Sequence, residues 1–156
     1  MSLSFWRFPA VVASTFVAMA AARSLHAAGQ SDSNASVRSA QDSASVLDGV
    51  FTAEQAQAGA ELFEGTCIRC HNPEQFVADG QYSPAARFKN LGEMFEKVST
   101  RMPADDPGSL PPEQYAAAMS YILTIAGYPA GQTELPAEAA KLLAVRLVPL
   151  PASAAR

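Results

Sequence analysis

The feature that most constrains this chain is the pentapeptide Cys67-Ile68-Arg69-Cys70-His71. It contains both cysteines of the 156-residue sequence and one of its two histidines. Two thiols three positions apart, followed directly by an imidazole, are typical of covalent haem attachment. In that chemistry Cys67 and Cys70 add to the two vinyl groups of one haem c, and His71 becomes the proximal iron ligand. The motif therefore predicts a single, covalently held haem.

Two other uses of this motif fit the sequence less well. A thioredoxin-like redox pair lies at a strand-to-helix turn, and no stretch here has the period-two alternation of a strand. A structural zinc site needs four ligands, whereas Cys67, Cys70 and His71 supply three. The other histidine, His26, lies in a segment that we expect to be removed. The mature chain then lacks the residues for a His-based zinc site, a Ser-His-Asp triad or bis-histidine ligation of haem.

Residues 1–28 predict a secretory signal peptide. Arg7 provides a positive start, residues 11–22 form an apolar run, and Ala27-Ala28 offers a cleavage site. The apolar run has about a dozen residues, fewer than the roughly 20 of a membrane span. We therefore expect a periplasmic protein, with an uncleaved membrane anchor as the alternative.

The charge of the chain argues against polyanionic partners. Removal of residues 1–28 takes away two of the 11 basic residues and none of the 15 acidic ones, which lowers the formal charge from −4 to −6. A chain this acidic is poorly suited to nucleic acid or to an anionic membrane surface. We expect redox proteins as partners and no nucleic acid.

The remaining sequence divides into three parts. Residues 29–50 are rich in Ser, Ala, Asp and Gln and predict a flexible polar lead-in. Residues 51–136 form the predicted domain, which is so small that it needs a staple such as a covalent haem. Residues 137–156 form a C-terminal extension; the stretch 136–148 is compatible with one more short helix, either packed on the surface or used to dock a partner subunit.

Helical periodicity predicts an all-α domain of three main helices wrapped around the haem. The first begins with a capping box at Thr52 and Gln55 and runs to about Gly65. The second runs from Pro84 or Ala85 to Ser99 and presents one apolar face. The third opens with Pro111-Pro112-Glu113-Gln114, ends at Gly127, and buries a stripe made of Tyr115, Ala118, Met119 and Ile122.

The second axial ligand of an electron-transfer haem is usually a methionine thioether. Met94 and Met119 lie inside predicted helices, where methionine more often fills the core. Met102 follows the second helix in a loop, and Pro103 biases it towards an extended conformation. Met102 is therefore our predicted distal iron ligand.

Residues 52–136 resemble the class I cytochrome c domains that accompany, or are fused to, periplasmic quinoprotein dehydrogenases. The resemblance lies in Gly59, Phe63 and the Cys-x-x-Cys-His motif, in the helix that leads into Arg101-Met102-Pro103, and in the closing stretches 107–110, 121–123 and 127–131. It implies that the first and last helices cross at the haem edge, that Gly59 permits their close approach, and that Phe63 packs near Tyr121.

The motifs and the resemblance together favour electron transfer rather than enzymatic catalysis. The expected donor is a periplasmic dehydrogenase, and the expected acceptor is another cytochrome or a terminal oxidase. The first alternative is a dedicated cytochrome subunit of one dehydrogenase complex. An alternative of another class is a haem-based ligand sensor or peroxidase with an open sixth position.

Overall fold

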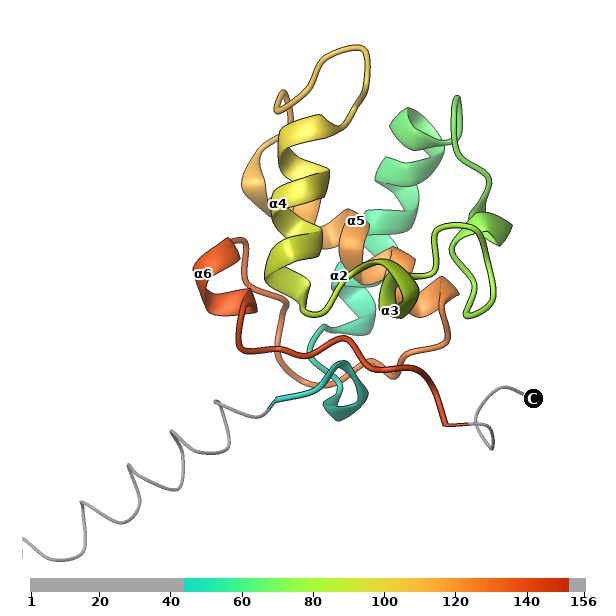
Figure 1. Cartoon of the computed structure of the whole chain (residues 1–156). Coiled ribbons are helices and arrows are strands. Elements are labelled where there is room, and N and C mark those ends of the chain that lie inside the picture. Colours follow the sequence, from blue (N-terminus) through green and yellow to red (C-terminus); the bar gives the residue numbers. More distant parts are fainter. Residues whose placement is uncertain (1–43, 152–156) are drawn as a thin grey trace, which may run out of the picture.

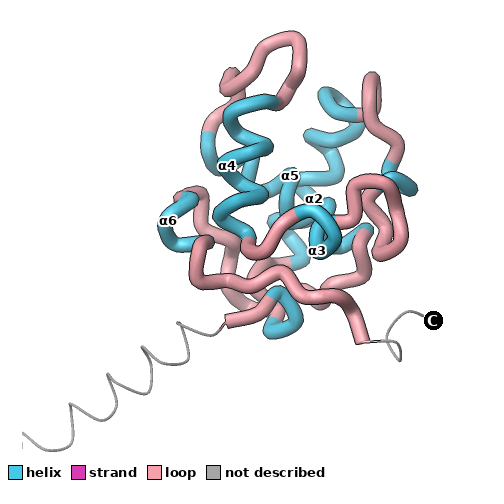
Figure 2. The backbone as a smooth tube through the Cα atoms, in the orientation of Figure 1, coloured by secondary structure: helices cyan, strands magenta, loops and turns pink. Residues whose placement is uncertain are grey.

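The computed structural model describes residues 44–151, and helices and loops make up this part of the chain (Figures 1 and 2). The regular elements are η1 (Val46–Asp48), α2 (Ala53–Leu62), the π-helical turn η2 (Phe63–Cys67), η3 (Pro73–Gln75), α3 (Pro84–Arg87), α4 (Leu91–Arg101), α5 (Pro112–Ile125) and α6 (Ala139–Leu142). Between residues 44 and 151 the only strand-like pairings are isolated bridges at Arg146. The predicted all-α fold with three main helices is confirmed.

Helices α2 and α5 cross at closest approach beside Gly59. A Cβ atom at this position would collide with the backbone carbonyl of Ala117 and would lie 3.0 Å from Cβ of Tyr121. One turn further on, at the first residue of η2, the ring of Phe63 packs edge-on against Tyr121, with centroids 5.3 Å apart. The crossing that the resemblance implied is therefore present, and glycine is what allows it.

The start of α2 confirms half of the predicted capping box. The Thr52 hydroxyl accepts a hydrogen bond from the backbone N–H of Gln55 at 3.1 Å. The Gln55 side chain does not return to Thr52. Its Nε2 donates to the carbonyl of Leu135 at 2.9 Å, and its Oε1 accepts from the N–H of Leu135 at 2.8 Å and from the hydroxyl of Ser120 at 3.0 Å. Gln55 thus fastens the chain beyond α5 onto α2.

The single helix predicted from residue 84 or 85 to residue 99 is wrong. The structure has the short helix α3 and the longer α4, separated by an extended Phe88 with φ −135° and ψ 148°. Asn90 caps α4, since its side-chain oxygen accepts from the N–H of Glu93 at 2.9 Å. An asparagine followed three residues later by glutamate is a signal for the start of a helix. This signal overrides the apolar periodicity, which continues from α3 into α4.

Segments close to both ends of the described chain pack together. The N–H of Val46 donates to the carbonyl of Arg146 at 3.0 Å, and the N–H of Arg146 donates to the carbonyl of Ala44 at 2.9 Å. Val46 is fully buried, so residues 44–50 belong to the packed domain and the flexible lead-in predicted to reach residue 50 is wrong there. The rest of that lead-in and the predicted signal peptide lie outside the described residues.

The beginning of the C-terminal extension also packs on the domain. Leu142 and Leu147 are buried, and the backbone of Leu147 donates to Lys89, just before α4. The expected extra helix is present as the four-residue α6. Within residues 44–151, no helix has both the length and the apolar character that crossing a membrane requires.

Candidate haem-binding site

The Cys-x-x-Cys-His segment leaves α2 through the π-helical turn η2. The N–H of Ile68 donates to the carbonyl of Phe63 at 2.9 Å, five residues back, so the helix widens as it reaches Cys67. Single π-helical turns of this kind occur often at functional sites. The carbonyl of Cys67 then accepts from the N–H groups of Cys70 and His71 at 3.1 and 2.9 Å, which closes the pentapeptide into a tight turn.

This turn borders a cavity of about 1000 Å³ with mainly apolar walls. The cavity matches the upper end of the size range of cofactor sites in proteins. All four predicted site residues line it: Cys67, Cys70, His71 and Met102. The other lining residues come from η2 and the attachment turn, from the segment between residues 76 and 88, from α4, from the loop between residues 103 and 110, and from α5. Among them are Phe63, Phe76, Tyr82, Phe88, Val98, Leu110, Tyr115, Ala118 and Ile122.

His71 is held by aromatic neighbours rather than by polar ones. Its ring lies 5.5 Å, centroid to centroid, from both Phe76 and Tyr82. Its Nδ1 atom is buried, and no residue of the part described by the structure forms a hydrogen bond with it. Buried polar atoms without a partner are rare, and a bound ion or ligand is one ordinary explanation. An imidazole without a polar partner beside two thiols in an apolar cavity fits the donor set of a covalently attached haem.

The two cysteines differ in their exposure. Cys67 is half-buried in the cavity wall, whereas Cys70 is exposed. Burial raises the pKa of the Cys67 thiol above its ordinary value, because the thiolate would lose solvation. Within residues 44–151 no three or more His, Cys, Asp or Glu side chains are grouped so that they could hold a metal ion.

Met102 directly follows α4 and is extended, with φ −123° and ψ 151°, as Pro103 predicts. Its N–H donates to the carbonyl of Val98 at 2.9 Å, so the last turn of α4 fixes where the side chain begins. Met94 also lines the cavity, from within α4, and is 2% exposed. The sequence predicts only a core position for Met94, because a helical methionine gives no sign of facing a cofactor. Met119 is buried and does not line the cavity.

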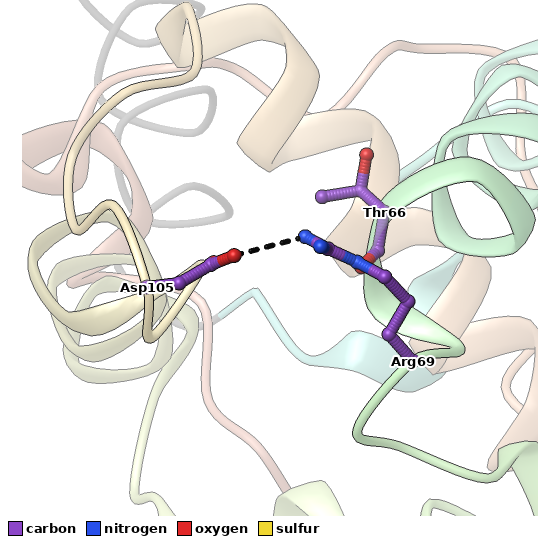
Figure 3. Close-up of polar contacts among 3 residues, drawn as sticks. All are labelled: Thr66, Arg69 and Asp105. Atoms are coloured by element: carbon purple, nitrogen blue, oxygen red, sulfur yellow. Dashed lines mark hydrogen bonds and ion pairs between the residues drawn. The ribbon is translucent and has the colours of Figure 1, made fainter.

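An ion pair joins the two segments that carry the predicted ligands. Nη2 of Arg69 lies 3.2 Å from Oδ2 of Asp105, and Nε of Arg69 donates to the carbonyl of Thr66 at 3.4 Å (Figure 3). Figure 1 shows the loop after α4 and the turn after α2 at the same end of the molecule. Both charged side chains are about 60% exposed, so the pair lies at the mouth of the cavity rather than inside it.

The cavity wall also contains basic residues that no sequence motif indicates. Arg87 and Lys97 line it together with Arg69. The guanidinium of Arg87 lies 5.2 Å from the ring centroid of Tyr82 and donates to the carbonyl of Gln81 at 3.3 Å. Isolated basic residues in a helical sequence usually face solvent, and only the folded structure shows that these face a common space.

Comparison with known families agrees with this geometry. Residues 54–122, which extend from the start of α2 into α5, match the family model described as cytochrome C oxidase, cbb3-type, subunit III. Neither a curated protein nor a solved structure gave a match to the chain. The matched region contains the Cys-x-x-Cys-His turn, Met102 and most of the cavity wall.

The fold, the site and the family match show that the chain carries a class I c-type cytochrome domain. Domains of this class bind haem c and take part in electron transfer. The expected class of protein is therefore confirmed. The family match does not extend to the more specific likeness to cytochromes of periplasmic dehydrogenases.

Proposed function

We propose that this protein is a periplasmic one-electron carrier with one haem c, attached through Cys67 and Cys70. His71 would hold the iron on one side and Met102 on the other. The observation that carries the proposal is that these four side chains line one apolar cavity of about 1000 Å³, although Met102 lies more than 30 positions from the others.

The chain supports this role by holding its side chains in place. When bound, the haem would supply a single iron centre that alternates between Fe(III) and Fe(II). Met102 begins at the capped end of α4, and His71 follows the closed turn of Cys67. Ligands fixed in this way would change little between the two oxidation states, and the apolar walls would exclude water. Arg87 and Lys97 are suited to hold the carboxylates of the haem, because both are basic and line the cavity.

The exposed residues of the attachment turn indicate where an electron would enter and leave. Cys70 is exposed and the neighbouring Ile68 is 48% exposed, so the haem edge attached here would face a docking partner. The resemblance to dehydrogenase-linked cytochromes favours a periplasmic dehydrogenase as donor. Another cytochrome or a terminal oxidase is the acceptor that we propose.

The alternative of a dedicated dehydrogenase subunit requires the C-terminal extension to dock a partner. In the structure, however, the start of this extension packs on the domain and buries Leu142 and Leu147. The packing of this segment instead supports a self-contained carrier. Co-purification of a catalytic dehydrogenase subunit at fixed stoichiometry would favour the alternative.

Absorption spectroscopy of the purified holoprotein tests the proposal. We expect a sharp c-type α-band in the reduced protein, no reaction with CO, and the weak far-red thioether-to-iron band in the oxidised protein. Met102→Ala should abolish the far-red band and open the iron to CO. Met94→Ala is the matched control, since it removes another methionine of the same cavity and should leave that band. Rapid CO binding by the unmodified protein would favour the sensor or peroxidase alternative.

A further inference from the structure

The loop that carries Met102 contributes little buried surface of its own. Residues 104–109 are exposed, and the chain is partly buried again only at Leu110. Apolar burial is the main force that holds a segment in place, so a loop as exposed as this one depends on its polar contacts. Two of those contacts meet at one backbone atom, the carbonyl oxygen of Met102.

The hydroxyl of Tyr115 donates to this oxygen at 2.7 Å. Tyr115 belongs to the first turns of α5 and is 3% exposed, and its ring packs edge-on against Phe95 of α4 with centroids 6.5 Å apart. The same hydroxyl accepts from the N–H of Leu110 at 3.3 Å. A single buried phenol therefore ties the first residue of the loop to the last.

We propose that Tyr115 is a positioning residue for Met102, and that its hydroxyl sets how firmly the thioether is held on the iron. The inference rests on the proposed function, because it requires Met102 to be the ligand. Tyr115 also lines the cavity, so its ring is fixed by the same walls as the haem. A loop tied at the ligand's own carbonyl cannot swing away without breaking this hydrogen bond.

Displacement of Met102 by added imidazole measures this effect directly. In that exchange the sulfur–iron bond breaks and a nitrogen–iron bond forms, with no change in oxidation state. Tyr115→Phe keeps the ring and removes only the hydroxyl. Loss of the hydrogen bond from Tyr115 makes it easier for imidazole to displace Met102. We therefore expect oxidised Tyr115→Phe to bind imidazole about three- to tenfold more tightly than the unmodified protein.

Tyr128→Phe is the matched control. Tyr128 is buried too, and its hydroxyl donates to the carbonyl of Val148 at 2.8 Å, away from the residues that line the cavity. We expect the imidazole affinity of Tyr128→Phe to stay within about twofold of that of the unmodified protein. Equal affinities in Tyr115→Phe and the unmodified protein would overturn the inference.

If Tyr115→Phe does not fold, Gly108→Ala is the second variant. The backbone N–H of Gly108 donates to the same carbonyl oxygen of Met102 at 3.3 Å, and Gly108 is exposed and has a φ of 79°. Alanine is strained at that φ, so this substitution should weaken the hydrogen bond to the Met102 carbonyl and tighten imidazole binding. Unchanged imidazole binding would refute the role of this carbonyl. A far-red band that survives Met102→Ala would instead refute the ligand assignment, separately from the role of Tyr115.

Discussion

The guanidinium of Arg69 lies 3.2 Å from the carboxylate of Asp105, and this contact joins the haem-attachment turn to the loop that carries Met102. Both residues line the cavity, and Figure 3 shows the contact between them. It complements the buried contact of Tyr115 with the same loop. Because both charged side chains are about 60% exposed, solvent and salt screen their attraction.

Arg69→Gln and Asp105→Asn should therefore have small effects on stability. We expect each to lower the free energy of unfolding by less than about 1 kcal/mol, and the difference to shrink at high salt. Denaturant titration of the holoprotein at low and high ionic strength measures this. A loss of several kcal/mol, unaffected by salt, would show that Arg69 has a packing role that its exposure does not suggest.

The close crossing of α2 and α5 makes a strong prediction at Gly59. Gly59→Ala forces a Cβ atom onto the carbonyl of Ala117, so the helices must separate, at a cost of about 1–3 kcal/mol or more. Gly65→Ala is the control, because a Cβ there meets no atom within 4 Å. That change should be neutral or stabilise by up to about 1 kcal/mol. Equal stability of the two variants by denaturant titration would contradict the observed crossing.

Gln55 makes a comparable prediction for the segment after α5. Gln55→Ala leaves both backbone polar groups of Leu135 without their side-chain partner, which should cost about 1–3 kcal/mol. Gln57→Ala changes an exposed residue of the same helix and should stay within about 0.5 kcal/mol of the unmodified protein. Faster backbone hydrogen exchange at Leu135 in Gln55→Ala alone would locate the effect; equal exchange in both variants would argue against it.

Burial at Tyr128 predicts a pH dependence. Burial raises the pKa of Tyr128 above its ordinary value of 10.0, because the phenolate would lose solvation. The unfolded chain then releases this proton at lower pH than the folded one, so stability is unaffected well below pH 10 and falls as the pH rises from there. Tyr128→Phe should lose about 1 kcal/mol at neutral pH, with its hydrogen bond to Val148, and should show a shallower alkaline decline. An unchanged alkaline slope would exclude Tyr128 as its source.

Much of the site follows from local sequence. The spacing of Cys67, Cys70 and His71 fixes their chemistry, and Pro103 fixes the extended backbone of Met102. Gly127 ends α5 with a positive φ of 92°, as its position predicts. In these cases a covalent or steric restriction acts within a few residues, so no knowledge of the tertiary structure is needed.

The remaining features depend on contacts between distant segments. Nothing local indicates that Gln55 would bond to Leu135 rather than return to Thr52, because Leu135 lies 80 positions further along the chain. Residues 44–50 follow a long polar stretch that predicts a flexible lead-in, yet Val46 is fully buried and the backbone of this segment pairs with Arg146, about a hundred positions later. The tie from Tyr115 to Met102 is likewise invisible in sequence, where Tyr115 shows only as one member of an apolar stripe.

Spectroelectrochemical titration of the purified holoprotein tests the central claim most directly. We expect one reversible wave that fits a single-electron Nernst curve, with the far-red band of the oxidised form disappearing at the same potential at which the α-band appears. We also expect CO to leave this curve unchanged. Two waves, a two-electron slope or a CO-dependent shift would contradict a single haem held by both His71 and Met102.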